Sequence, residues 1–368
     1  MLFAVGLGIN VFAIVQLVRK EHPPNPPARF GLAIVTLWAL RFFFFYTKFE
    51  PWALDYPIFV VVDQNFFLLD PVLLWMYARS IIRPFKWNWL TLLHFVPASI
   101  GLFSGIRSAI LYPAEVIDQF NQSVNGMMEN DPLISTGITI IISVMLLISV
   151  FYFIRSVLEV KNYDASLKDN YSNIENLKVS WVVSFQRLWI VLFLLPVLLY
   201  FANYIYSAID IMVTVSVLMT SLVLLSVFFN SNLMNQSYVT NVIPKKKSIE
   251  QAPSEVSQDD RALIEKLMNN LSSERYYEDE QISLDQLAEY VHLKPSELTE
   301  LIKKSEYDNF YDLINSFRID AVKRSLAETT EQIIVIAYQC GFNSKSAFNK
   351  IFKEKTGLTP REYRLSLK

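Results

Sequence analysis

The 368-residue sequence is poor in the residues from which most catalytic centres are built. It has one cysteine, Cys340, and three histidines that lie far apart, His22, His94 and His292. One cysteine excludes a disulfide within the chain, and scattered histidines argue against a metal centre. The nine glycines form neither a GxGxxG nor a GxxxxGK[ST] string, so both common phosphate-binding loops are absent. We therefore predict no metal, no cofactor and no enzymatic activity.

Charged residues are also scarce. They make up 18% of the chain, against 52% hydrophobic residues, whereas soluble domains carry about 25% charged residues. The net charge of −2 excludes a nucleic-acid binder that works through bulk positive charge. These averages over the whole chain conceal a difference between its two parts, because the long apolar runs all lie before residue 230.

Seven apolar stretches occupy this N-terminal part, and each is near the length of about 20 residues that a helix needs to cross a bilayer. They cover residues 1–18, 28–46, 58–78, 89–106, 133–154, 182–204 and 208–229. We predict an all-α fold, in which a seven-helix transmembrane bundle over 1–230 is followed by a polar tether at 231–258. A soluble domain of 259–368 completes the chain.

The basic residues between the stretches predict the orientation. With the N-terminus outside, the three inner loops hold ten Lys or Arg residues, and the outer loops hold only Lys48 and Arg107. Such a bias is typical of a multi-pass protein of the cell (inner) membrane, with its C-terminal domain in the cytoplasm. The inner residues are Arg19, Lys20, Arg29, Arg79, Arg83, Lys86, Arg155, Lys161, Lys168 and Lys178. Because Arg19 and Lys20 follow the first apolar run, that run reads as a span and not as a cleaved signal peptide.

The C-terminal domain reads as two helix-turn-helix units, at about 283–304 and 333–356. Ser283 opens the first with a capping box, and Asn343 is the expected cap of the second helix of the second unit. A helix of about 20 residues, near 308–328, joins the units and is roughly 30 Å long. That length is close to one turn of B-DNA, so both second helices could enter successive major grooves.

One string in this domain is recognisable. The residues AYQCGFNSKSAFNKIFKEKTGLTPREYR, from Ala337 to Arg364, closely resemble the signature of AraC/XylS-type transcription regulators. The resemblance extends over about 268–366 and implies a double-stranded DNA partner. The membrane half is similar, in hydropathy and layout, to that of membrane-embedded bacterial regulators of the same type.

In the second unit, the helix expected in the groove carries the candidate DNA-binding side chains. The family uses the positions of Ser346 and Lys350 to reach base edges, although arginine is more usual than lysine at the latter. Lys345 and Lys353 fit phosphate contacts equally well. Residues 341–368 hold seven basic and two acidic residues, a net of +5, which disfavours a merely solvated face. The full set is Asn343, Ser344, Lys345, Ser346, Asn349, Lys350 and Lys353.

The first unit has the opposite charge. Residues 283–316 hold three lysines and seven acids, a net of −4, and Glu300 stands where the family often places arginine. This unit either contributes weak DNA contacts through Lys294, Ser296 and Lys303 or serves partly as a packing surface. On the joining helix, Arg318, Lys323 and Arg324 are expected to be solvated rather than to contact DNA.

Ionisable residues within the predicted spans mark a second candidate site. They are Arg41, Asp63, Asp70 and Arg187, and such residues are costly in a bilayer. Asp63 and Asp70 are seven residues apart, on one helix face, where they could pair with an arginine and receive a signal. The alternative is structural, with aspartates that lock helices together and Arg187 extending to the membrane boundary. The outer loop 107–132 is another candidate for receiving a signal.

These observations favour a one-component, membrane-embedded transcription regulator that responds to an unidentified small-molecule or envelope signal. Its expected partners are DNA, the lipid bilayer and, on a two-fold operator, a second copy of the chain. Proteolytic release of the DNA-binding domain stays open as a variant. The alternative is a membrane receptor whose cytoplasmic helical domain binds a protein in place of DNA.

Overall fold

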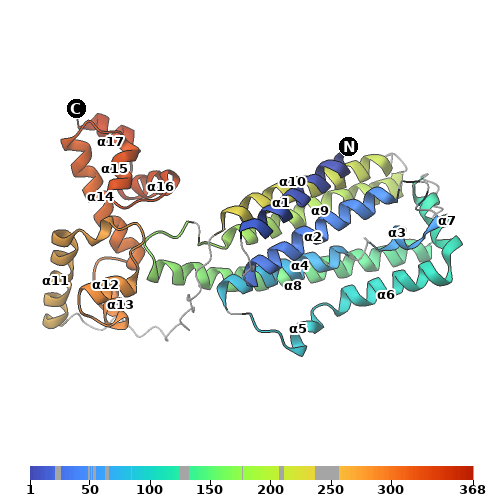
Figure 1. Ribbon diagram of the computed structural model, residues 1–368, viewed down its shortest axis with the longest axis horizontal. Coiled ribbons are helices and arrows are strands. Elements are labelled where there is room, and N and C mark those ends of the chain that lie inside the picture. The colour runs from blue at the N-terminus through green and yellow to red at the C-terminus, as the bar shows by residue number, and fades with distance from the viewer. Residues whose placement is uncertain are drawn as a thin grey trace. The chain divides into compact units, whose positions relative to one another are not determined.

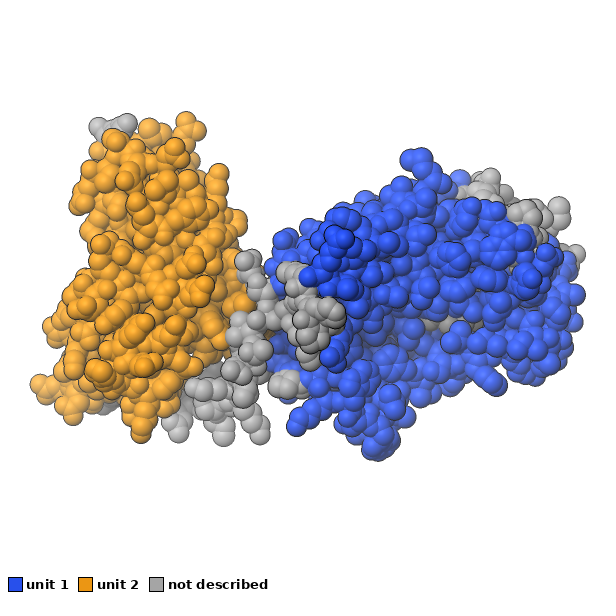
Figure 2. Space-filling view, in the orientation of Figure 1, with its two compact units in different colours: residues 1–161, 179–239 blue, residues 162–178, 240–368 orange. Residues whose placement is uncertain are grey.

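The protein is helical throughout the part of the chain described in the computed structural model. That part comprises residues 1–20, 26–48, 50, 52, 55–62, 66–83, 85–124, 132–175, 177–206, 211–236 and 257–367. It contains no β-strand, and its one isolated β-bridge joins Tyr171 to Ser283. The chain forms two compact units, residues 1–161 with 179–239 (unit 1) and residues 162–178 with 240–368 (unit 2) (Figure 2).

Unit 1 is a bundle of apolar helices. They are α1 (Leu2–Lys20), α2 (Pro26–Thr47), α3 (Ile58–Val61), α4 (Phe66–Ile82), α5 (Trp89–Leu93), α6 (Val96–Leu111), α7 (Pro113–Val124), α8 (Pro132–Asn170), α9 (Ser180–Tyr206) and α10 (Ile211–Asn235) (Figure 1). The last residues of α8, from 162 onward, belong to unit 2. Six helical segments of the described chain are long and apolar enough to span a membrane. A seventh exists only if α6 and α7, which are bent by 105° at their junction, count as one span.

Small and polar residues let these helices pack closely. On α1, a Cβ at Gly6 would lie 2.4 Å from the Phe42 ring of α2, so glycine permits this approach. The amide of Asn10, also on α1, donates to Ser226 Oγ at 3.2 Å and accepts from Asn230 Nδ2 at 3.3 Å, both on α10. Hydrogen bonds of this kind between buried side chains are typical of helix contacts in membranes.

The helix limits differ from expectation at two places. The span predicted at 133–154 belongs to a helix of 39 residues that continues through a charged segment to Asn170. The tether predicted at 231–258 is helical at its start, because α10 continues to Asn235 and its terminal amides bond to carbonyls one turn back. Ser257 caps the following helix, and residues 237–256 lie outside the described part of the chain.

Unit 2 contains the helices expected from Ser283 onward, in the expected order, and two elements before them that were not predicted, α11 and η3. The elements are α11 (Gln258–Glu274), the 3-10 turn η3 (Tyr276–Glu278), α12 (Leu284–Tyr290), α13 (Pro295–Lys304), α14 (Phe310–Glu328), α15 (Ile333–Gln339), α16 (Lys345–Thr356) and α17 (Pro360–Ser366). The capping box predicted at Ser283 is confirmed, and Thr359 and Glu362 form another at the start of α17. In Figure 1, α14 runs between α11–α13 and α15–α17, so it joins the two helix-turn-helix units.

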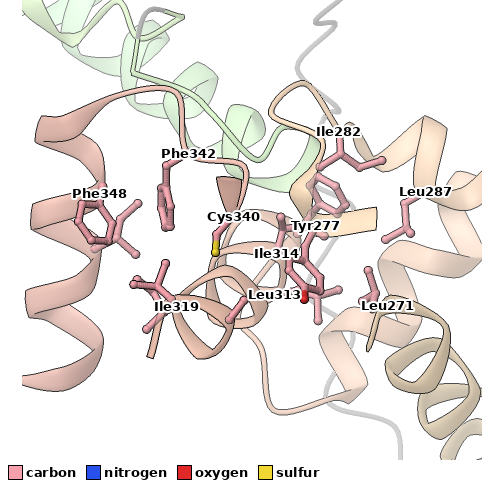
Figure 3. Packing of buried hydrophobic residues seen from close by; sticks show 14 of the residues in the cluster. Leu271, Tyr277, Ile282, Leu287, Leu313, Ile314, Ile319, Cys340, Phe342 and Phe348 are labelled. Carbon is pink, nitrogen blue, oxygen red and sulfur yellow. The ribbon is translucent and has the colours of Figure 1, made fainter. Parts of the chain in front are cut away.

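One hydrophobic core runs through both helix-turn-helix units. Figure 3 shows it extending from Phe348 and Phe342, past Cys340, to Tyr277 and Leu271. Burial raises the pKa of the Cys340 thiol to about 11, so this cysteine is an uncharged core residue. Because the core is continuous, the two helix-turn-helix units are parts of one domain.

Gly341 is the backbone position on which this continuity depends, and it yields a stability prediction. Its φ is +88°, and a Cβ there would lie 2.5 Å from Tyr277 O and 2.8 Å from Glu278 O. Gly341→Ala should lower the free energy of unfolding of unit 2 by about 3 kcal/mol, from left-handed strain plus overlap with rigid backbone. Pulse proteolysis of the full-length protein in detergent, over a urea series, would measure the loss.

The matched control is Gly357→Ala. Gly357 has φ +76°, but nothing lies within 4 Å of where its Cβ would be, so the substitution should cost only about 1 kcal/mol. Equal losses for the two variants would contradict the close approach at Gly341.

Candidate nucleic-acid interface

The exposed face of α16 is the candidate interface of the second helix-turn-helix unit. Its opposite face buries Ala347, Phe348, Ile351 and Phe352 in the core. This spacing follows the helical repeat, so the intervening polar residues face outward. Six of the seven predicted residues are exposed, namely Asn343, Lys345, Ser346, Asn349, Lys350 and Lys353.

The seventh residue, Ser344, is half-buried because it caps the helix. The expectation that Asn343 is the cap is wrong, since α16 begins one residue later than that expectation requires. Ser344 Oγ accepts from the backbone N–H of Ala347 at 3.4 Å and lies 2.9 Å from Ser346 Oγ. Ser344 therefore sets where the helix begins, and Asn343 remains on the surface.

Few strong contacts hold the lysines of this face. Lys350 Nζ lies 3.8 Å from Glu354 Oε1, and both side chains are more than 60% exposed. Such a surface pair contributes little and can exchange for a phosphate or a base edge. By contrast, Lys355 bonds Asp312 on α14, with both side chains partly buried, and thus fastens α16 to the joining helix.

A groove beside α16 adds a basic residue that the sequence reasoning missed. Its volume is about 470 Å³, and its lining includes Lys345 and Asn349 of α16 and Arg361 of α17. Two cations on one groove suit a phosphate backbone. Arg361 follows Pro360 at the start of a helix, and this position alone did not mark it as an interface residue.

The corresponding surface of the first unit is exposed but carries more negative charge. Lys294 and Ser296 lie exposed at the start of α13. Lys303 is paired with Glu300 at 3.0 Å, and both side chains are more than half exposed. The acidic Glu300 therefore lies beside one of the three residues predicted to contact DNA.

Arg318 corrects an expectation, because it is fully buried rather than solvated. Its Nε donates to Tyr277 O at 2.7 Å and its Nη2 to Asp279 O at 2.8 Å. Burial lowers the pKa of its guanidinium to about 10, so it stays charged at neutral pH. The pattern could have shown this, since Ile314, Ala321 and Val322 place position 318 on the buried face of α14.

The residues predicted within the membrane spans do not all come together. Arg41 Nη1 and Asp70 Oδ2 form a buried ion pair of 2.8 Å, and Trp38 Nε1 donates to Asp70 Oδ1 at 2.9 Å. Arg187 is exposed on α9. Asp63 lies outside the described residues.

The Arg41–Asp70 pair leaves little room for a ligand. The Arg41 guanidinium lies 4.1 Å from the centre of the Phe67 ring, and its Nε and Nη2 are buried without a hydrogen-bond partner among the described residues. The adjoining cavity, lined by Arg41, Trp38 and Trp189, is about 10 Å³. That is near the space needed by one water molecule.

Comparisons with known proteins support the interpretation of unit 2. Residues 287–366 match a family model described as a helix-turn-helix domain. An HTH-type transcriptional regulator of Staphylococcus aureus strain COL is 39% identical over 85 residues, which cover 23% of this chain and 11% of that protein. The regulator YobQ of Bacillus subtilis strain 168 is 32% identical over 88 residues, 24% of this chain and 36% of that protein.

Among solved structures, the C-terminal domain of AraT, a response regulator from Geobacillus stearothermophilus, is 23% identical. The match covers 31% of this chain and 88% of that one, with a TM-score of 0.26. The chain spans only about a tenth of the length of the staphylococcal relatives.

Residues 287–366 of the chain are therefore a helix-turn-helix domain. Proteins with this domain include HTH-type transcriptional regulators, a non-enzymatic class. Among the described residues, no three His, Cys, Asp or Glu side chains group as metal ligands.

The buried ion pair gives a prediction for unit 1. Asp70→Leu leaves the Arg41 charge buried and unpaired, and should lower the free energy of unfolding by about 3–5 kcal/mol. The double variant Arg41→Met/Asp70→Leu should recover most of this loss, apart from about 1 kcal/mol for the unpaired Trp38 N–H. Thermal unfolding of the full-length protein in detergent, followed by tryptophan fluorescence, would compare them. A double variant as unstable as the single one would refute this account of the pair.

Proposed function

We propose that the protein is a one-component transcription regulator embedded in the cell membrane, which binds DNA sequence-specifically through its C-terminal domain. The observation that carries this proposal is the exposed polar face of α16, within a segment that matches the helix-turn-helix family. The core side of α16 is apolar, and the exposed residues named above can all donate hydrogen bonds to bases or phosphates. Ser346 and Lys350 are the proposed base-reading residues.

The length and the apolar composition of the helices of unit 1 support the membrane part of the proposal. Within the described residues, six helices are long and apolar enough to span a bilayer, or seven if α6 and α7 form one bent span. The distribution of Lys and Arg favours an outer N-terminus and a cytoplasmic DNA-binding domain. The tether would occupy the polar segment before α11, and a second copy of the chain would occupy the other half of a two-fold operator.

The proposed signal site is the Arg41–Asp70 pair. A ligand or an envelope stress that separated this pair would leave two buried charges unpaired, which is costly enough to move a helix. Because the adjoining cavity is about 10 Å³, helix movement must open it before anything larger than water can bind.

The test is selection of random genomic DNA fragments on the full-length protein in detergent, over a series of salt concentrations. We expect a shared sequence to be enriched, with affinity that falls as salt rises. Lys350→Ala and Ser346→Ala should each lower affinity for that sequence by about 10-fold or more and relax preference at one base pair. Lys353→Ala should weaken binding to all sequences and reduce the salt slope by about 1.

The matched control is Lys266→Ala, which removes an exposed lysine from α11 of the same domain. It should leave affinity and salt slope nearly unchanged. If the folded protein enriches no sequence, the proposal fails. The alternative, a receptor whose helical domain binds a protein partner, then becomes the better hypothesis.

A further inference from the structure

The loop between α8 and α9 is packed within unit 2, although it comes from the membrane half of the sequence. Residues 162–178 belong to this unit, and Ser172 and Ile174 are buried. The match to the helix-turn-helix family covers only residues 287–366. The loop is therefore an addition from outside the matched domain.

The loop first contacts the segment that precedes α12. Tyr171 and Ser283 form an antiparallel bridge, and Ser172 Oγ donates to Ile282 O at 2.9 Å. Asn173 Nδ2 donates to Glu280 O. These contacts fix the loop to the chain immediately before the first helix-turn-helix unit.

The loop also contacts the joining helix and the turn of the second unit. Ser172 O accepts from Asn315 Nδ2 at 3.2 Å, and Ser172 Oγ lies 3.2 Å from Arg318 Nη2. Asn173 Nδ2 reaches Gly341 O at 3.3 Å. Three consecutive loop residues thus touch the first unit, the joining helix and the second unit at once.

A further contact involves Tyr311 of α14, whose hydroxyl donates to Glu175 Oε1 at 3.3 Å. Burial and the Glu175 carboxylate raise the pKa of Tyr311 above its usual range. Its hydroxyl therefore stays a donor to the loop throughout the physiological pH range.

The buried donors that contact the loop also have acceptors within the domain itself. Arg318 holds Tyr277 O and Asp279 O at 2.7 and 2.8 Å, but its contacts with Ser172 are 3.2 and 3.5 Å. Asn315 similarly holds Tyr311 O at 2.8 Å and Ser172 O at 3.2 Å. The domain can therefore release the loop and still satisfy most donors of its own buried residues.

We infer that residues 171–175 are a built-in ligand of the junction between the two helix-turn-helix units, through which the membrane half controls how those units engage DNA. This rests on the proposed function. The loop directly follows α8, which begins in the predicted span, so displacement of that helix pulls on Tyr171 and Ser172. Because DNA with two sub-sites requires one relative placement of α13 and α16, a docked loop favours binding and a released loop weakens it.

The experiment compares full-length Ser172→Ala/Asn173→Ala with Asn162→Ala, which removes an exposed amide from the same segment. The first readout is hydrogen exchange, which needs no DNA. In the double variant, we expect at least tenfold faster exchange in 171–175 and at 277–282 and 341–342, with α12 to α16 still protected. Asn162→Ala should match the wild type.

The second readout is affinity for the sequence selected on the wild-type protein. The double variant should bind it at least threefold more weakly, and should tolerate one or two base pairs inserted between the sub-sites better than the wild type does. Unchanged exchange at the junction, or unchanged or tighter binding, overturns the inference. If the wild type selects no DNA, the proposed function fails, but the exchange result still decides whether the loop docks.

A cross-link covers the case in which the double variant does not fold. Bridge partners have Cα atoms about 4.5–5.5 Å apart, within the range of a disulfide. Tyr171→Cys/Ser283→Cys should therefore oxidise to an intramolecular disulfide in the full-length protein, while Tyr171→Cys/Lys266→Cys should not. Absence of the first disulfide overturns the docking.

Discussion

A single buried cation, Arg318, holds together the parts of unit 2 that would bind DNA. Its guanidinium has no carboxylate partner within ion-pair distance among the described residues, and is instead surrounded by carbonyl oxygens of residues 277 and 279. The same side chain lies 2.9 Å from where a Cβ of Gly341 would be and 5.7 Å from the centre of the Phe342 ring. A buried guanidinium needs these carbonyl acceptors. If the turn of the second helix-turn-helix unit moved away from residues 277–279, which precede the first unit, the Arg318 guanidinium would become exposed or lose its acceptors.

Most of the helices of unit 2 could be predicted because their ends are marked by local chemistry. Capping boxes at Ser283 and Thr359 and glycines at 341 and 357 each fix a boundary through bonds within a few residues. The burial of Arg318 was missed because composition treats arginine as a surface residue, although its helical spacing pointed inward. The predicted cap of α16, Asn343, is one residue before the actual cap, Ser344. Both residue types are good caps, so which one caps the helix depends on where the preceding turn ends.

The contacts of the α8–α9 loop could not be predicted from the sequence at all. Ser172 and Asn173 donate mainly to backbone carbonyls of residues more than 100 positions away. A carbonyl is present at every residue, so no side-chain pattern at positions 280–282 marks it as an acceptor. Hydropathy placed the end of the predicted span near residue 154, because charged residues follow it. The helix α8 nevertheless continues to Asn170, and its residues from 162 onward belong to unit 2.

The charge difference between the two helix-turn-helix units explains why the junction matters so much for the proposed function. The second unit is basic, and under the proposed function its exposed face would meet the phosphate backbone, whereas the first unit places Glu300 beside Lys303. An acidic surface gains from DNA only where a base donor such as cytosine N4 meets it, and it loses wherever it meets phosphate. Under the proposed function, the first unit would therefore add to affinity only where its few donors meet the DNA, and the contacts around Arg318 would set its placement. A signal that altered the junction would leave the basic α16 free to bind any DNA weakly, while it removed the specific contribution of the first unit. In such a protein, the signal would change the preference for one DNA sequence more than the affinity for DNA of any sequence.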